Sequence, residues 1–246
     1  MSIREKLAKI ATDMPKVYEA GKAEGEQAGR KAIWDGLQDY GNRTDYRTAF
    51  YGLLDEVFYP THDIKPTIAQ QMFSYSKITN LKQRLLDCGV KLDLSKATTV
   101  WEAFFRAYEL THLPVIDTTS ATSVDYMIAD CTSLVEVEKI ILKADGSQGS
   151  GGLLGYCSSL ERVTIEGTIG KNSINLSRSR KLNKASIISV INALSTTSSG
   201  LTATISITAT NKEFETSAGA NNGSTSAEWL ALIATRPNWT IALSDW

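Results

Sequence analysis

Hydrophobic positions in the middle of the chain recur at every third residue, and this pattern occurs four times. A row of this kind cannot bury its own apolar side, so successive units are expected to stack and share one core. The third position of each row is a leucine, and these leucines lie 21, 26 and 22 residues apart. The rows are Ala107, Leu110, Leu113 and Ile116; Ile128, Cys131, Leu134 and Val137; Leu154, Cys157, Leu160 and Val163; and Leu176, Ser179, Leu182 and Ala185.

The rows predict a short right-handed solenoid over residues 91–183, in which each unit ends in a short strand. Lys139 to Leu142 and Val163 to Glu166 have the composition expected of such strands. Cys131 and Cys157 occupy the same repeat position, which gives both a structural role. A glycine- and serine-rich stretch, 145–152, separates two units and is expected to be a flexible insertion.

The first 33 residues have a helical pattern. Ile3, Leu7, Ile10, Met14 and Val17 are separated by 4, 3, 4 and 3 residues, which places them on one stripe of a helix. The same spacing is typical of a coiled coil, so this helix is predicted either to oligomerise or attach the chain, or to lie on its own domain.

Residues 34–90 are rich in aromatic side chains and are predicted to form a helical collar. A binding patch is the alternative for this region. Residues 184–246 are predicted to form an α/β cap: a helix begins after Asn183, another after Ser226, and strands cover 201–208 and 239–243. The segment 216–225 is small and polar and is expected to be an exposed loop.

Charge and composition narrow the possible functions. The 246 residues carry 26 basic and 27 acidic side chains, a net charge of -1, which argues against a nucleic-acid partner. No apolar stretch reaches the length of a membrane span, so membrane insertion is not expected. The start, Met1 to Lys6, lacks the apolar core of a signal peptide, so assembly in the cytoplasm is expected. Cys88, Cys131 and Cys157 are predicted to be reduced core thiols.

The sequence offers little catalytic chemistry. Histidine occurs only at His62 and His112, and His112, near Glu109, is expected at the edge of a unit and partly buried. No phosphate-binding loop, metalloprotease helix or nucleophile elbow is present, so no catalytic, cofactor or metal site is predicted and no binding residue is singled out. Four acids cluster in sequence around the second row, and paired acids could serve a glycosidase, although solvated surface acids are the favoured interpretation. They are Asp125, Asp130, Glu136 and Glu138.

The repeated units resemble the BspA-like leucine-rich repeats, in which a hydrophobe, a cysteine and a leucine precede a short strand at three-residue steps. The likeness covers roughly residues 92–186 and is closest at Cys131 to Leu134 and at Cys157 to Leu160. The segments from Pro15 to Gly21 and from Trp34 to Gln38 resemble the start of minor structural proteins encoded by phages and prophages of gut Firmicutes. Lys184 to Leu194 and the closing Asn238 to Ile241 are similar to later parts of those proteins.

The resemblance implies an α+β virion protein, tail-associated or otherwise structural, that acts without catalysis in particle assembly or host-surface recognition. It implies other virion proteins, and a bacterial surface protein or glycan, as partners, with homo-oligomerisation through the N-terminal helix. Two alternatives stay open: a bacterial leucine-rich-repeat adhesin or scaffold unrelated to phage, and a glycan-active enzyme.

Overall fold

The computed structural model describes residues 46, 49–55, 58–214 and 223–245, and these contain four α-helices and six strands. The expected N-terminal helix lies outside the described residues. The elements, in chain order, are α3 (Leu81–Cys88), β1 (His112–Asp117), β2 (Glu136–Ile141), β3 (Arg162–Glu166), β4 (Ile174–Leu176), α4 (Lys184–Ala193), β5 (Leu201–Ile205), α5 (Ile207–Glu213), the 3-10 turn η2 (Gly223–Thr225), α6 (Ala227–Ala234) and β6 (Trp239–Leu243).

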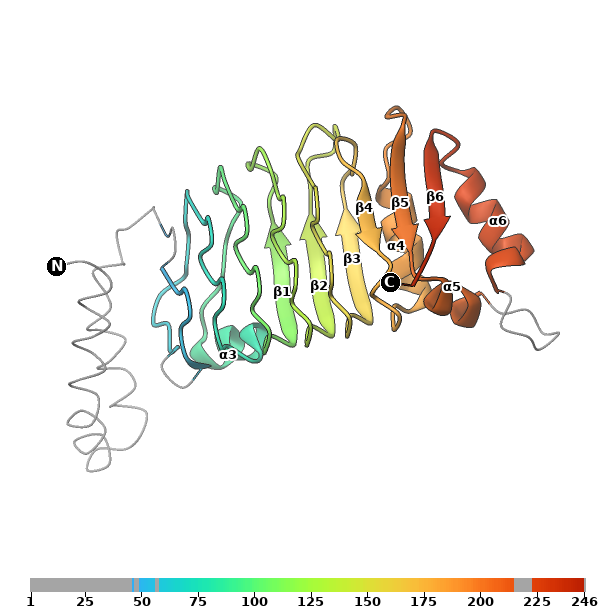
Figure 1. Ribbon diagram of the computed structural model, residues 1–246. Helices are drawn as coiled ribbons and strands as arrows, with labels where there is room; N and C mark the ends of the chain where they lie inside the picture. The colour runs from blue at the N-terminus through green and yellow to red at the C-terminus, as the bar shows by residue number, and fades with distance from the viewer. Residues whose placement is uncertain (1–45, 47–48, 56–57, 215–222, 246) are drawn as a thin grey trace, which may run out of the picture.

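The strands form two three-stranded parallel sheets, ordered β1-β2-β3 and β4-β5-β6. They lie side by side along an elongated body, with α3 at the lower edge near β1 and α6 beside β6 (Figure 1). Parallel strands need a long return connection. Between β1, β2 and β3 each return is a segment of bends and turns, here called a leg, whereas the later returns contain helices α4, α5 and α6. These legs also pair with one another: backbone N–H groups of Phe104, Tyr126 and Ile128 donate to carbonyls of the next turn along the chain.

The pairing corrects the register of the first predicted row. Leu113 pairs with Val137, and Val137 pairs with Val163. The sequence alignment had set Leu113 against Leu134, which is one three-residue step too early. The residues of the other rows agree with the pairing, because Asn183 donates its backbone N–H to Glu161 just as Glu161 donates to Val135.

The core is continuous and runs between the strands and the legs. Its N-terminal part is aromatic: the Phe73 ring stacks between Phe50, at 4.8 Å, and Phe104, at 5.4 Å, measured between ring centroids. Phe58 meets the Phe73 ring edge-on at 5.6 Å. These rings are buried, whereas Tyr51 of the same aromatic segment is exposed. The segment 58–80 consists of turns and short bridges, and α3 is the helix found in the described part of the expected collar.

Helix α4 occupies the place beside β3 where another strand would pair. Asn183 caps it by accepting a hydrogen bond from the Ser186 backbone N–H, at 2.9 Å. Ser186 Oγ then accepts the backbone N–H of Val163 at 2.9 Å, and Ser189 Oγ accepts that of Ile165 at 2.8 Å. Two serine hydroxyls therefore satisfy the free edge of β3, which would otherwise expose unpaired amides.

The predicted leucine-rich-repeat-like solenoid with a separate α/β cap is wrong as a description of the fold. The described residues form an α+β structure with four helices and two separate parallel sheets. The physical reason lies at α4, because the helix capped by Asn183 replaces the strand of the fourth unit. Strand β4, inside the expected solenoid, then pairs with β5 from the expected cap.

Several C-terminal predictions are confirmed. Helix α4 begins directly after its Asn183 cap, helix α6 begins after Ser226 and ends at Ala234, and β6 spans Trp239–Leu243. The strand predicted over 201–208 is shorter, since β5 ends at Ile205. Ser206 Oγ accepts the backbone N–H of Ala209 and starts α5, a helix that the alternating pattern did not reveal.

Candidate functional site

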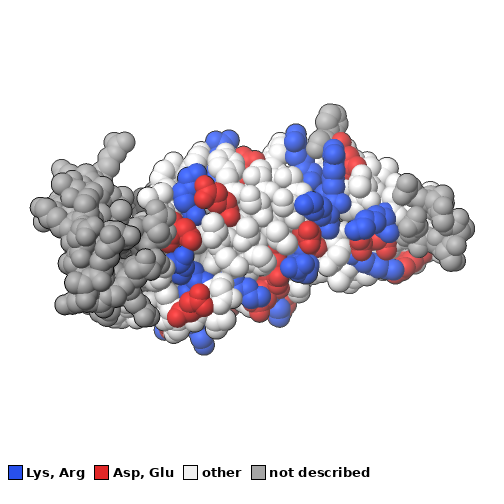
Figure 2. Space-filling model, turned by 90° about the horizontal axis from the view of Figure 1, so that it is seen from below, with Lys and Arg blue, Asp and Glu red and all other residues white. Residues whose placement is uncertain are grey.

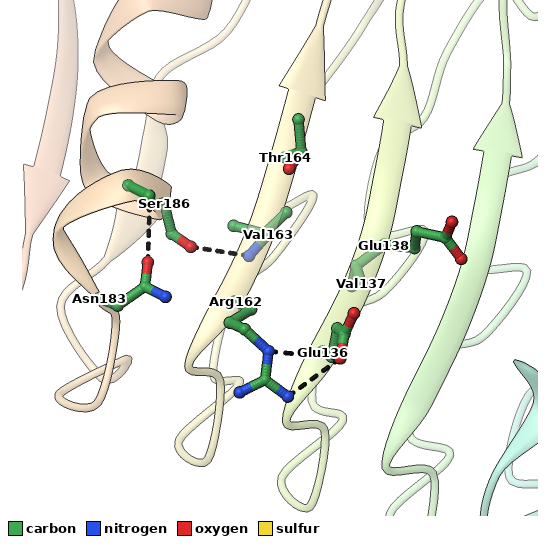
Figure 3. Close-up of a pocket in the computed structure, with 9 residues that line it drawn as sticks. Glu136, Val137, Glu138, Arg162, Val163, Thr164, Asn183 and Ser186 are labelled. Carbon is green, nitrogen blue, oxygen red and sulfur yellow. Dashed lines mark hydrogen bonds and ion pairs between the residues drawn. The ribbon is translucent and has the colours of Figure 1, made fainter.

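A shallow pocket of about 180 Å³ lies on the sheet surface between β2, β3 and the start of α4 (Figure 3). Arg162 reaches from β3 to Glu136 on β2, with 3.0 Å between Nη2 and Oε2. Lys82 of α3 approaches Glu136 at 3.5 Å and Glu138 at 3.1 Å. Figure 3 also shows Asn183 and Ser186 at the opposite wall, engaged with each other and with Val163.

The charges around this pocket compensate one another. The hydrogen bond from Arg162 lowers the pKa of Glu136 more than burial raises it, and the nearby charge of Lys82 lowers it further. The hydrogen bond to Glu138 in turn raises the pKa of Lys82, with Glu136 adding to the effect. Glu136 is thus held ionised by cations of the chain, which suits an ion-pair network that joins strands.

The four acids that cluster in sequence do not share one site. Glu136 and Glu138 line the sheet pocket, whereas Asp130 pairs with Arg106 at 3.1 Å between Oδ2 and Nε. Asp125 accepts a hydrogen bond from the Ser123 hydroxyl at 2.5 Å. Glu136 and Glu138 share Lys82, whereas Asp125 and Asp130 each have other partners, so the four acids divide among three places.

The remaining sequence candidates have structural environments. His112 is partly buried, as predicted, and its Nδ1 lies 2.9 Å from the Thr111 hydroxyl. The expected flexible insertion 145–152 is instead packed, because Gln148 is buried and donates to the carbonyls of Thr118 and Ala121 at 2.8 and 3.1 Å. Most of the 216–225 loop lies outside the described residues.

The cysteines behave as structural thiols. Cys131 and Cys157 are fully buried, and each Sγ lies against a carbonyl of the preceding turn, Phe104 at 3.0 Å and Ile128 at 3.1 Å. Burial raises the pKa of Cys157 to about 12 and raises that of Cys131 well above its usual value. Ser179 occupies the equivalent place in the next turn and donates to the Cys157 carbonyl at 3.0 Å. Cys88 is partly exposed.

The most unusual backbone lies in the legs that return from one strand to the next. Left-handed backbone places Cβ close to a neighbouring carbonyl oxygen, so bulky residues with positive φ are uncommon. Here they come in pairs four residues apart, one pair in each of four successive legs. The pairs are Gln71 and Tyr75, Glu102 and Arg106, Tyr126 and Asp130, and Gly152 and Tyr156.

Backbone pairing aligns the members of these pairs into two rows. Tyr75 donates its backbone N–H to Phe105, Arg106 donates to Ala129, and Asp130 donates to Gly155. Each acceptor directly precedes the equivalent member of the next pair. The outer row is therefore Tyr75, Arg106, Asp130 and Tyr156, and the inner row is Gln71, Glu102, Tyr126 and Gly152.

Side chains of three outer-row residues, Tyr75, Arg106 and Asp130, are connected. Arg106 Nη1 donates to the Tyr75 hydroxyl at 2.9 Å, and its Nε donates to Asp130. These two hydrogen bonds raise the already high pKa of Arg106, so it stays charged. Arg106 also lies 4.8 Å above the Phe105 ring, and Arg178 lies 5.2 Å above the Tyr156 ring.

In the inner row Gln71 Nε2 donates to Glu102 Oε2 at 2.7 Å. The Tyr126 ring lies over Gly152, where an added Cβ would sit 2.6 Å from the ring. Tyr126 and Tyr156 are 49% and 57% exposed, the largest exposures among the described tyrosines. We call the two rows, together with Tyr108 and Arg178, the tyrosine ridge.

Sequence reasoning did not find the tyrosine ridge. The outer-row residues each stand one position before a small inward-facing residue: Ser76, Ala107, Cys131 and Cys157. Once the units are aligned on that small residue, the outer row becomes visible as a column. The first row was aligned three residues away, so Arg106 was not placed in the column with Asp130 and Tyr156.

Comparisons with protein-family models, with curated proteins and with solved structures found no match for the chain.

Among the described residues, no group of three or more His, Cys, Asp and Glu side chains is placed to hold a metal ion. None of the helices in the described ranges has the length and apolar character needed to cross a membrane. Figure 2 shows basic and acidic side chains interspersed over the described part of the lower face.

Proposed function

We propose that this chain is a non-enzymatic structural protein of a phage or prophage particle, tail-associated or otherwise part of the virion. It acts in particle assembly or host-surface recognition through the tyrosine ridge. Its partners are other virion proteins, with a bacterial surface protein or glycan as the external one. The likeness of Pro15 to Gly21 and of Lys184 to Leu194 to phage minor structural proteins supports the virion setting.

The observation that carries the proposal is the backbone conformation of the ridge. A left-handed conformation costs a non-glycine residue about 1–2 kcal/mol. Glycine avoids that cost and is used at Gly52 and Gly152, which lie at equivalent places in other turns. Tyr75, Tyr126 and Tyr156 are kept at such places nevertheless, and two of them are about half exposed. Side chains kept at a cost to stability are expected where they serve a function.

The residue types on the ridge suit binding. Tyrosine and arginine carry a large share of the energy in protein interfaces, because they bury a large area with few rotatable bonds or make several directed hydrogen bonds. Arg106 and Tyr75 are already held together by the hydrogen bond that Arg106 Nη1 donates to the Tyr75 hydroxyl. A ligand would therefore meet side chains that lose little freedom on binding.

The distribution of acids supports binding over catalysis. Glu136, Glu138 and Asp130 are each paired with a basic side chain of the chain itself. A general acid needs a raised pKa, whereas the pKa of Glu136 is lowered.

The proposal is tested in particles purified from lysates of the bacterium that carries the gene. The gene is replaced by a Tyr126→Gly, Tyr156→Gly version or by a Leu86→Ala control, which removes an exposed apolar side chain on α3. Quantitative mass spectrometry measures the amount of the chain in the purified particles, and we expect the wild-type and control chains to be present there in equal amounts. The ridge variant should be depleted about tenfold, or its particles should adsorb to cells about tenfold more slowly. Absence of the wild-type chain from particles, or normal incorporation and adsorption of the ridge variant, would overturn the proposal.

A further inference from the structure

The outer row of the tyrosine ridge has an order that is complementary to its own reverse. On four successive turns it presents Tyr75, Arg106, Asp130 and Tyr156, that is, aromatic, positive, negative and aromatic. Read from the other end, the order is aromatic, negative, positive and aromatic. When the row faces a reversed copy, each charge therefore meets its opposite and each aromatic ring meets an aromatic ring.

We propose that the partner of the tyrosine ridge is a second copy of this chain, bound face to face about a two-fold axis that runs across the ridge. This inference rests on the proposed function and names the partner of the same surface. Two-fold interfaces use one patch on both subunits, so a self-complementary patch is their requirement. Arg106 then faces Asp130 of the second copy, and Tyr75 faces its Tyr156.

The inner row fits the same axis. The reversal sets Glu102 opposite Tyr126 of the second copy, where a phenol hydroxyl can donate to a carboxylate. It sets Gln71 opposite Gly152, over which the Tyr126 ring of the same copy lies, so the Gln71 amide meets the face of that ring. A two-fold axis parallel to the legs reverses the order of the turns but leaves the direction along each leg unchanged. The inner row of one copy therefore faces the inner row of the other, and the same rotation pairs both rows.

Charge and spacing favour a second copy over a charged polymer. The ridge carries Arg106 and Arg178 against Glu102 and Asp130, so its formal charge balances. A nucleic acid or another polyanion would gain no net attraction from it. Parallel strands and legs repeat at about 4.8 Å, and only a surface with the same repeat can follow all four turns in register. Four turns give a small contact, so a dissociation constant on the order of micromolar is expected.

The order of charges makes an experiment possible that tests orientation as well as contact. Sedimentation equilibrium on the full chain measures association of Arg106→Asp, Asp130→Arg and the double variant that carries both. Each single variant places like charges opposite each other and should weaken self-association at least about tenfold. The double variant restores complementarity between copies and also the Arg106–Asp130 ion pair within the chain. An equimolar mixture of the two single variants restores complementarity only between unlike chains, so it tests the contact between copies. Both should associate about as well as wild type, and so should Thr164→Asp on the exposed side of β3.

The outcomes separate this inference from the function on which it rests. Rescue by the double variant and by the mixture, with loss in each single variant, is the expected result. Single variants that associate like wild type overturn the second copy as the ridge partner, as does a double variant that stays impaired. A wild-type chain that stays monomeric at a concentration 100-fold above the expected dissociation constant of about 1 µM also overturns it. If ridge variants still deplete the chain from particles in that case, the proposed function stands with a different partner.

Discussion

The sheet surface and the tyrosine ridge differ in backbone conformation and in the exposure of their aromatic side chains. On the sheet surface the backbone is extended, and charged residues such as Lys139 and Glu166 pair across strands at 3.0 Å. On the ridge the backbone is left-handed, and tyrosine rings stand in solvent. Polar side chains pair with one another on both surfaces, but the ridge also holds large side chains in backbone conformations that favour glycine.

This difference separates residues that keep the fold from residues that the fold displays. Changes on the sheet side should lower stability in proportion to the backbone contacts they disturb. Changes on the ridge should alter association more than stability.

The largest effect is expected from a comparison of two glycines. Gly167, after β3, has a φ of +91°, and an added Cβ would press on the backbone carbonyl of Leu142. Gly152 on the ridge would instead press on the movable Tyr126 ring. We expect Gly167→Ala to cost about 3 kcal/mol or more and Gly152→Ala about 1 kcal/mol, measured by urea unfolding. Equal costs would contradict the distinction between the two surfaces.

The serine hydroxyls at the edge of β3 should matter next. Ser189→Ala leaves the Ile165 backbone N–H without its acceptor and should cost about 1–3 kcal/mol in the free energy of unfolding. The matched control is Ser158→Ala, whose exposed hydroxyl donates to Thr132 at 3.3 Å. We expect its effect to stay below about 0.5 kcal/mol. A Ser189→Ala variant as stable as this control would show that α4 does not cap the edge.

The buried thiol of Cys157 should make the fold sensitive to alkali. Its pKa is about 12 in the folded chain against an ordinary 9.0, so folding favours the neutral thiol. This stability is fully present below pH 9 and is lost as pH rises towards 12. At pH 10 the loss should be about 1.4 kcal/mol relative to pH 7.

Cys157→Ser provides the control, because Ser179 already fills the equivalent place in the next turn with a hydroxyl. We expect the variant to lose correspondingly less stability between pH 7 and pH 10 in urea unfolding at each pH. An identical pH dependence in both proteins would rule out Cys157 as the cause.

The smallest effect is expected from the exposed ion pairs of the sheet surface. Glu136→Gln removes the charge that Arg162 and Lys82 share and should cost about 0.2–1 kcal/mol at pH 7. The pKa of Glu136 is lowered in the folded chain, so wild-type and variant stability should converge as pH falls through that value. The measurement is urea unfolding at pH 7 and pH 3. A loss above about 3 kcal/mol would mean that the pair behaves as a buried one.

Much of the local structure follows from the sequence. Asn183 and Ser226 cap helices where predicted, because each side chain can accept a backbone N–H three residues on. The buried positions Cys131, Leu134 and Val137 follow the three-residue spacing. Register is harder to predict, because Phe104, Ala107, Leu110 and Leu113 are also buried at three-residue steps. A pattern that continues past its own unit cannot say where the unit begins, which is why the first row was misplaced.

The ridge was hidden for a different reason. Left-handed backbone is normally signalled by glycine or asparagine, and here it is adopted by residues such as Tyr75, Arg106 and Tyr156. Contacts between turns impose that conformation, and local sequence preferences do not reveal it. The replacement of a strand by α4 was likewise decided by a cap and two serines rather than by the repeat.

The most direct test of the central claim is the stability of Tyr126→Gly, Tyr156→Gly, measured by urea unfolding at concentrations where the chain is monomeric. If the ridge tyrosines serve binding, the stability lost with their ring contacts is offset by the conformational cost that glycine avoids in left-handed backbone. The variant should then unfold within about 1 kcal/mol of wild type. A loss greater than about 3 kcal/mol would show that these rings hold the fold together, and would contradict the account.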